Sequence, residues 1–299
     1  PFPEPAYTIT PEENPEYQSH FFRFIYTSLI TPNSVIDYDM NAHEWLVQKE
    51  QEIPSGYDRN DFIAERIFAT SADGTSVPLS IVYKKDTQKN GNNPCLLYSY
   101  GSYGYSTEPV FSSNRLSLLE RGFVFAMGHI RGGSEMGRAW YDDGKMLNKR
   151  NTFADFIACA ETLIAQGYTN SNKIAIQGGS AGGLLVGASM TMRPELFRAV
   201  IAKVPFVDIV NTMSDPSIPL TTLEYQQWGN PDDETYFHYL MSYSPYDNIR
   251  TTSYPNILIT TGLNDPRVAY WEPAKFTARL RELKTDNNLL LLKTNFDAG

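Results

Sequence analysis

The segment "IAIQGGSAGGLLVG", residues 174–187, decides the fold that we expect for this chain. A short apolar strand runs into the turn "GGSAG" (178–182), and a helix of small residues follows at once. G-x-S-x-G in this setting places a serine hydroxyl on a sharp turn at the edge of a sheet. A phosphate-binding loop is the alternative, but no lysine follows the second glycine pair and G-x-G-x-x-G does not fit. The pattern therefore predicts Ser180 as a nucleophile on an α/β sheet.

Strand and helix patterns alternate from about residue 75 onward. Strands are expected at 76–85, 94–101, 122–130, 173–177, 199–205, 256–262 and 288–294, and helices at 152–168, 181–192 and 272–283. Thr152 and Asp155 resemble a capping box at the start of the first helix, and Gly167 marks its end. This order of elements indicates a mostly parallel sheet with helices on both faces.

Residues 1 to about 70 have a different composition, rich in Pro, Tyr, Phe and Thr. Alternating runs at 22–30, 34–40 and 44–51 predict consecutive antiparallel strands. A small meander of this kind has exposed edges and is a poor independent fold. We therefore expect these residues to belong to a larger all-β unit, and the first residue, Pro1, to be a cut rather than a natural start.

The composition excludes several classes of protein. Hydrophobic residues make up 41% and charged residues 20% of 299, which is typical of globular proteins. The net charge of −9 argues against nucleic acid or an anionic membrane as the partner, and no apolar run is long enough to span a bilayer. No signal peptide is visible, so a cytoplasmic location is expected. Cys95 and Cys159 are expected as buried thiols, with no disulfide framework and no metal-ligand spacing.

A serine nucleophile needs a base, and the base needs an acid that orients it, in the chain order Ser, Asp or Glu, His. Asp265 follows the apolar strand expected at 256–262 and is the candidate acid. Its alternative role is that of a turn aspartate before a proline. The histidines are His20, His43, His129 and His238. All of them precede Asp265, so the expected base is missing from this order.

Several longer strings resemble the oligopeptidase B branch of the prolyl oligopeptidase family of serine peptidases. They include "YSYGSYG" (98–104), "RGFVFAMGHIRGGSEMGRAWYDDGK" (121–145), "SIPLTTLEYQQWGNP" (217–231) and "TTGLNDPRVAYWEPAKF" (260–276). The resemblance implies the end of a β-propeller and a linker over residues 1–65, followed by an α/β-hydrolase peptidase domain over 66–299. It also implies that "DAG" (297–299) leads directly into the catalytic histidine, so that the chain is truncated just before its base.

The resemblance assigns roles to individual residues. Ser180 corresponds to the family nucleophile and Asp265 to the acid of the triad. Tyr100 corresponds to the tyrosine whose hydroxyl shares the oxyanion hole with a backbone amide, here that of Ala181. Arg267 corresponds to the arginine that holds a substrate carbonyl, a role that suits the fixed donors of a guanidinium.

The resemblance also implies cleavage after Arg or Lys, through paired glutamates. Glu224 stands at the first position of the pair, but Gln226 stands at the second and offers only a neutral acceptor. We therefore expect a basic preference that is weaker than with two carboxylates. Glu108 matches one member of a further acidic pair whose other member is replaced by Val110, so dibasic selectivity is not expected. Phe206 either flanks the substrate side chain or packs in the core.

Together these features predict a serine oligopeptidase that cleaves short, basic peptides without a metal or organic cofactor. The 299-residue chain itself is expected to be inactive because it lacks the triad histidine. Two alternatives remain at this point. One is an esterase or acylaminoacyl-peptidase-like hydrolase on the same fold, and the other is a truncated hydrolase that serves as a non-catalytic binding module.

Overall fold

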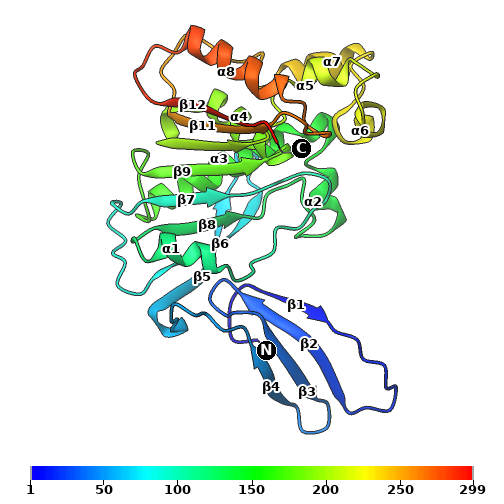
Figure 1. Cartoon of the computed structure of the whole chain (residues 1–299), viewed down its shortest axis with the longest axis vertical. Coiled ribbons are helices and arrows are strands. Elements are labelled where there is room, and N and C mark those ends of the chain that lie inside the picture. The colour runs from blue at the N-terminus through cyan, green and yellow to red at the C-terminus, as the bar shows by residue number, and fades with distance from the viewer. Residues whose placement is uncertain (1, 298–299) are drawn as a thin grey trace.

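The computed structural model describes residues 2–297, which form two separate sheets. Figure 1 shows the small N-terminal sheet beneath the larger, helix-covered one. None of the helices in residues 2–297 has the length and apolar character needed to cross a bilayer.

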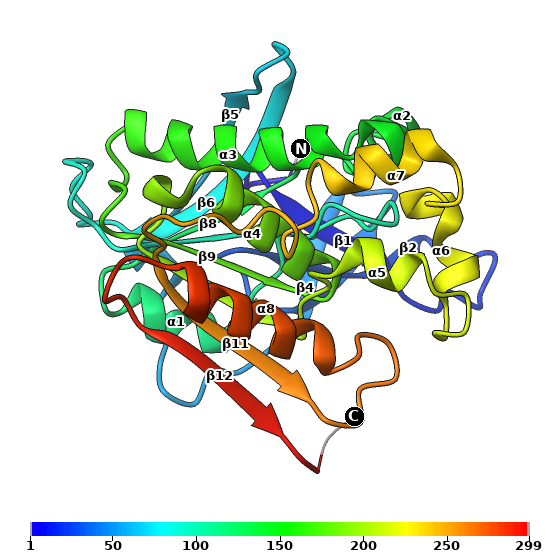
Figure 2. The ribbon, with the colours of Figure 1, turned by 90° about the horizontal axis from the view of Figure 1, so that it is seen from above.

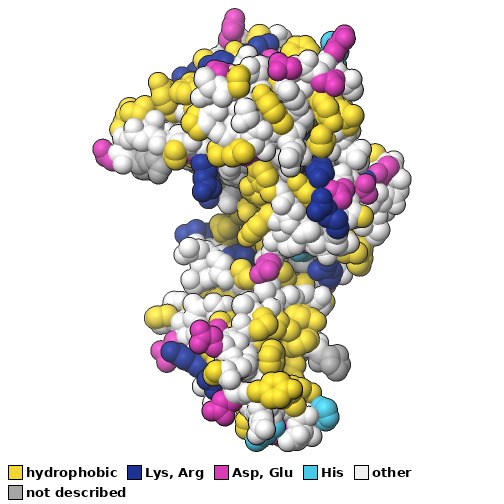
Figure 3. All heavy atoms as spheres, turned by 90° about the vertical axis from the view of Figure 1, so that its right-hand side faces the viewer, with side chains coloured by type: hydrophobic (Ala, Val, Ile, Leu, Met, Phe, Trp, Pro, Cys, Tyr) yellow, Lys and Arg dark blue, Asp and Glu magenta, His cyan; other side chains and the backbone are white. Residues whose placement is uncertain are grey.

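The small sheet is antiparallel, with its strands in chain order. Its strands are β1 (Tyr7–Pro11), β2 (Phe21–Ser28), β3 (Ser34–Asp39) and β4 (Glu44–Glu50). Phe24, Tyr26 and Ile36 are buried on one face, where Trp45 packs against them. Other hydrophobic side chains remain exposed, and Figure 3 shows them gathered over this sheet at the bottom of the molecule. Four strands that run up and down in this way resemble one blade of a propeller.

The large sheet has eight strands in the order β12-β11-β10-β9-β7-β8-β6-β5. They are β5 (Phe62–Thr70), β6 (Ser76–Lys84), β7 (Cys95–Tyr98), β8 (Val124–Gly128), β9 (Ile174–Gly179), β10 (Ala199–Lys203), β11 (Asn256–Gly262) and β12 (Leu290–Asn295). Strand β6 pairs antiparallel with β5 and with β8. All neighbouring pairs in the remaining series, β8-β7-β9-β10-β11-β12, are parallel. Strand β5 was not predicted, and the boundary predicted at 65/66 falls within it.

Helices cover both faces of the large sheet, as predicted. They are α1 (Ser113–Leu119), α2 (Arg138–Asp142), α3 (Arg150–Ala165), α4 (Ala181–Met192), α5 (Ile209–Met213), α6 (Thr221–Trp228), α7 (Glu234–Met241) and α8 (Trp271–Leu283). Figure 2 shows α3, α4 and α8 on one face of the sheet and α1 on the other. A mostly parallel sheet with this strand order and these two helical layers is the α/β-hydrolase fold. The sequence-based prediction of the fold class is therefore confirmed.

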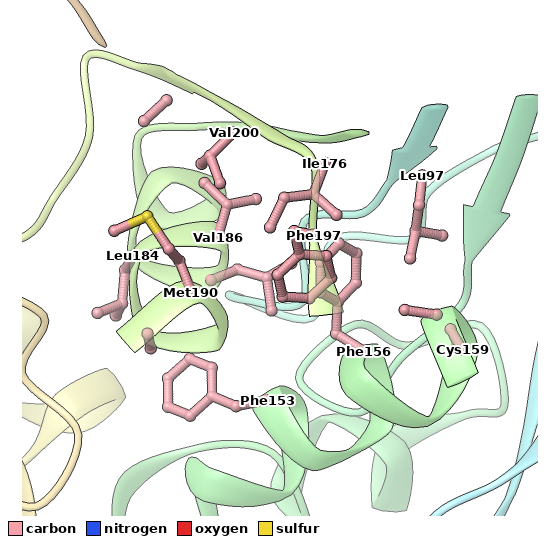
Figure 4. Close-up of a cluster of buried hydrophobic side chains, with 14 of the residues drawn as sticks. Leu97, Phe153, Phe156, Cys159, Ile176, Leu184, Val186, Met190, Phe197 and Val200 are labelled. Carbon is pink, nitrogen blue, oxygen red and sulfur yellow. The ribbon is translucent and has the colours of Figure 1, made fainter. Parts of the chain in front are cut away.

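The main core lies between the large sheet and helices α3 and α4. Figure 4 shows Phe153 and Phe156 of α3 facing α4, beneath Ile176 of strand β9. Nearly every residue of α4 is buried, including Leu184 and Met190. A helix that is enclosed on all sides cannot shift without opening the core, so the turn before it is held firmly.

Both cysteines of the chain are free thiols buried in this core, as the sequence predicts. Burial raises the pKa of Cys95 and of Cys159 above the ordinary thiol value. Neither is therefore suited to act as a reactive thiolate.

The capping box predicted at Thr152 is wrong, because helix α3 begins at Arg150. Thr152 lies inside the first turn and donates to the Gly144 carbonyl at 3.2 Å. Asp155, the other half of the predicted box, accepts from the Arg131 Nε at 2.8 Å and Nη2 at 2.6 Å. Its side chain is fully buried, so this ion pair joins the loop after β8 to helix α3.

We predict that Asp155→Ala lowers the free energy of unfolding by about 3–5 kcal/mol, because the Arg131 guanidinium is left buried without its main partner. Urea unfolding measures the loss. Asp73→Ala is the matched control, since Asp73 pairs with the same guanidinium but its side chain is 46% exposed. The control should cost about 1 kcal/mol or less. Equal losses in both variants would contradict this account of the buried pair.

Candidate active site

Ser180 lies at the sharp turn between β9 and α4, with φ 56° and ψ −120°. A positive φ is unfavourable for a residue with a side chain and persists only where the surroundings enforce it. The Ser180 N–H donates to the Lys203 carbonyl at 2.9 Å, and its carbonyl accepts from the Phe206 N–H at 3.1 Å. Strand β10 and the loop after it thus hold Ser180 in the strained conformation.

Glycines allow helix α4 to lie close both to strand β9 and to the loop after β10, and the turn depends on both contacts. A Cβ at Gly178 would lie 2.0 Å from the Gly182 carbonyl oxygen. A Cβ at Gly183 would lie 2.4 Å from the Cα of Pro205. Because both obstacles are backbone or ring atoms, neither position accepts a side chain without moving the main chain.

A pocket of about 330 Å³ opens beside Ser180 at the carboxyl ends of the strands. The predicted site residues that line it are Tyr100, Ser180, Ala181, Phe206, Glu224 and Arg267. Ala181 is the first residue of α4, so its N–H has no partner within the helix. The helix N-terminus therefore presents a free donor and positive potential at the side of Ser180.

Tyr100 follows β7 and is half-buried in the wall of the pocket. Burial raises the pKa of Tyr100 above its ordinary value, and the charge of Glu224 adds to the rise, whereas the neighbouring Ser180 hydroxyl acts against it. The phenol is therefore protonated at neutral pH and is available as a hydrogen-bond donor beside Ser180.

Glu224 extends from α6 into the pocket and is held by two neutral donors. Its Oε2 accepts from the Tyr103 hydroxyl at 2.7 Å and from the Trp228 Nε1 at 2.5 Å. Its Oε1 accepts no hydrogen bond from residues 2–297. The carboxylate is thus fixed in place by one oxygen, and the other is available for a cationic ligand. Sequence reasoning missed both donors, although Tyr103 lies within the quoted "YSYGSYG" string.

Asp265 follows β11 and closes its own turn. Its Oδ1 accepts from the N–H groups of Arg267 at 2.9 Å and Val268 at 3.0 Å. Asp265 therefore has the alternative role of a turn aspartate that the sequence also allowed. Asp265 lines a second hollow, and that hollow shares Thr212, Pro219 and Arg267 with the pocket of Ser180. Asp265 therefore lies beside the pocket of Ser180 rather than in it.

No histidine lines the pocket of Ser180 within residues 2–297. His20 and His43 flank strands of the small sheet, and His238 lies on the surface of α7. His129 is buried, and its Nε2 lies 2.8 Å from the Ser80 hydroxyl. The predicted step "DAG" ends in Ala298 and Gly299, which lie outside the described residues.

The structure does not bring Gln226 and Glu108 into the pocket of Ser180. Gln226 is exposed on α6, because residues two positions apart on a helix do not share a face, so Glu224 alone enters the pocket. Glu108 is exposed at a separate hollow, which Tyr98 and Arg115 also line.

Glu272 supports the pocket from behind, and sequence reasoning missed it. Its Oε2 accepts from the N–H groups of Val207 and Asp208, each at 2.9 Å, and its Oε1 accepts from the Thr212 hydroxyl at 2.7 Å. These bonds fix the loop that carries Phe206 to the pocket. Burial raises the pKa of Glu272 to about 7, and the charge of Asp208 adds to the rise.

The fold and the strained serine turn define an α/β-hydrolase. Residues 109–299 match the prolyl oligopeptidase family, and the chain belongs to that family.

Relatives of the same family are similar to this chain over nearly its whole length. Protease 2 of Moraxella lacunata is 50% identical over 296 residues, or 99% of this chain and 43% of the relative. Dipeptidyl aminopeptidase BI of Pseudoxanthomonas mexicana is 48% identical over 297 residues, or 99% of this chain and 41% of the relative. The structure of oligopeptidase B from Leishmania major superposes with a TM-score of 0.93 at 51% identity, covering 100% of this chain and 42% of that one. The chain thus spans about two fifths of the length of these relatives.

We predict that Glu272 makes the protein less stable as the pH rises from 4.5 to 7, the interval between its ordinary and its folded-state pKa. Within this interval the folded state retains a proton that the unfolded state releases, so the free energy of unfolding falls with rising pH. Its contribution is fully present below pH 4.5 and is lost above pH 7.

Glu272→Gln should remove this slope, which amounts to on the order of 3 kcal/mol across the interval. Urea unfolding of both proteins at the two ends of the interval measures it. Glu282→Gln, an exposed change on the same helix, should keep the slope of the unsubstituted protein. A slope that survives in Glu272→Gln would show that another group is responsible.

Proposed function

We propose that the protein from which this chain comes is a serine peptidase that cleaves short peptides after Arg or Lys. The observation that carries the proposal is the position of Ser180, which is held at positive φ at the start of α4 and faces a pocket that contains one carboxylate. Membership of the prolyl oligopeptidase family supports the same reaction.

In the proposed reaction, the Ser180 Oγ attacks the carbonyl carbon of the scissile bond while a histidine takes its proton. The negative charge that develops on the carbonyl oxygen is stabilised by the Ala181 N–H and the Tyr100 hydroxyl. The same histidine then gives the proton to the leaving amine, and water releases the acyl group by the reverse path. Asp265 orients the histidine through its Oδ2, because its Oδ1 is occupied by the turn.

The preference for a basic residue rests on Glu224. A carboxylate oxygen free of bonds to residues 2–297, in a pocket beside the nucleophile, suits an ammonium or guanidinium group. Phe206 lies against Trp228, with ring centroids 5.5 Å apart, and offers an apolar surface to the stem of the substrate side chain. Arg267 lines the same pocket, and in the proposed reaction its guanidinium binds a substrate carbonyl. Since Gln226 and Glu108 point elsewhere, the preference is for one basic residue and is weaker than with paired carboxylates.

One test of the proposed function concerns Ser180. In the full-length protein, Ser180→Ala should lower kcat on a peptide amide by about 10,000-fold or more, because the attacking group is lost. The 299-residue chain alone should show no Ser180-dependent turnover, since no histidine lines its pocket within the described residues. Peptide cleavage followed by mass spectrometry measures both. Turnover that survives Ser180→Ala would contradict the proposal, hydrolysis of esters alone would indicate an esterase, and no turnover at all would indicate a binding module.

A further test of the proposed function concerns substrate specificity. Glu224→Gln should lower kcat/KM on a substrate with Arg before the scissile bond by about 10- to 100-fold relative to a matched Ala substrate, because the charged partner is lost. Gln226→Ala is the matched control on the same helix and should leave the Arg to Ala ratio unchanged. Equal kcat/KM on the two substrates in the unsubstituted enzyme would rule out the basic preference.

A further inference from the structure

A lysine is buried directly behind the candidate site, and the reaction proposed above makes no use of it. Lys149 is 1% exposed and directly precedes α3. Its Nζ donates to the Gly101 carbonyl at 2.6 Å and to the Ser102 hydroxyl at 3.0 Å. No carboxylate oxygen lies within 4.0 Å of the Nζ in the part of the chain that the structure describes. A buried amine with only neutral partners is costly, so its retention calls for a local explanation.

The first connection runs from Lys149 to the turn that carries Tyr100. Gly101 has φ +69°, and the Gly132 backbone packs so closely on its carbonyl that a Cβ at Gly132 would lie 2.1 Å from that oxygen. The Lys149 Nζ therefore occupies the open side of this carbonyl. Ser102, its second acceptor, is fully buried. The two bonds fix the turn immediately after Tyr100.

The second connection runs from Lys149 to the helix that carries Glu224. The Lys149 Nζ lies 5.2 Å from the ring centroid of Trp228. Trp228 is fully buried, and its Nε1 donates to the Glu224 carboxylate. The same ring lies 5.7 Å from that of Tyr103, the other donor to Glu224. The amine thus lies over the face of the indole whose Nε1 holds Glu224.

We propose that Lys149 is a positioning residue, which fixes the turn of Tyr100 and the α6 carboxylate of Glu224 in one relative position. It touches neither the nucleophile nor the carboxylate. It acts through Gly101 and Ser102 on one side and through Trp228 on the other. Its contribution is to keep the Tyr100 hydroxyl, which donates to the oxyanion, at a constant distance from the Glu224 carboxylate, which binds the substrate side chain.

This role does not require a permanent charge. Burial lowers the pKa of Lys149 to about 7. A neutral amine still has two hydrogens, which match its two acceptors, Gly101 and Ser102. An ammonium adds attraction to the face of Trp228. Both forms therefore hold the turn of Tyr100, and both lie against α6.

The test uses the full-length protein and rests on the proposed peptidase function. Lys149→Met keeps the length and the burial of the side chain but removes both hydrogen bonds. It should lower kcat on an Arg amide substrate by about 10- to 100-fold, as small misplacements of a reacting group do. It should also weaken inhibition by benzamidine, a small cation that probes the Glu224 pocket. Lys173→Met, an exposed change before β9, is the matched control and should change neither.

A second background separates positioning from general structural damage. Tyr100→Phe removes the oxyanion donor that Lys149 positions through Gly101 and Ser102. Adding Lys149→Met to it should therefore lower kcat by no more than about 3-fold. The same fractional loss in both backgrounds would overturn the positioning role. If Lys149→Met fails to fold, Ser102→Ala replaces it, because it removes one acceptor and keeps the lysine. Ser102→Ala should lower kcat less than Lys149→Met does, and this loss should also shrink in the Tyr100→Phe background. Equal fractional losses in both backgrounds would again overturn the positioning role.

The outcomes also separate this inference from the proposed function. Absence of Ser180-dependent turnover by the unsubstituted full-length protein would overturn the peptidase function, and the positioning role with it. Normal turnover combined with additive losses would overturn the positioning role alone.

Discussion

The close approach of strand β9 (Ile174–Gly179) to helix α4 (Ala181–Met192) is the constraint on which the rest of the site depends. Gly178 has no side chain, so β9 comes close to the backbone of α4, and Gly183 has none, so the loop after β10 comes close to α4 as well. Between these backbones Ser180 adopts a positive φ. That conformation directs the serine toward the helix N-terminus and the pocket. The buried surroundings of α4 supply the stability that offsets the local strain.

The ionisable side chains at the site are held in place by hydrogen bonds to neutral groups. Glu224 is fixed by a phenol and an indole, and Lys149 by a carbonyl and a hydroxyl, so neither neutralises the other. Glu272 likewise accepts backbone and hydroxyl donors to support the loop of Phe206. A pocket built in this way keeps the Glu224 carboxylate available, because the Lys149 amine donates to Gly101 and Ser102 instead.

Much of the architecture could be predicted because it rests on local patterns. The buried parallel strands and the long helices have clear periodicity, and the glycine-rich turn requires a specific conformation. Strand β5 (Phe62–Thr70) was missed because its sequence, "FIAERIFAT", breaks the alternation with a charged pair. The capping box failed because the true partner of Asp155 is Arg131, 24 residues away. Lys149 could not be found from sequence, since nothing local marks a lysine as buried.

The central claim is that the turn between β9 and α4 makes Ser180 the reactive group of this protein. Labelling of the full-length protein with a fluorophosphonate, followed by peptide mapping, tests it most directly, because the reagent forms a covalent bond only with an activated nucleophile. The account predicts one modified residue, Ser180, and loss of labelling when Arg-containing peptides compete. Modification of another residue, or an unmodified Ser180 in a folded protein that cleaves peptides, would contradict it.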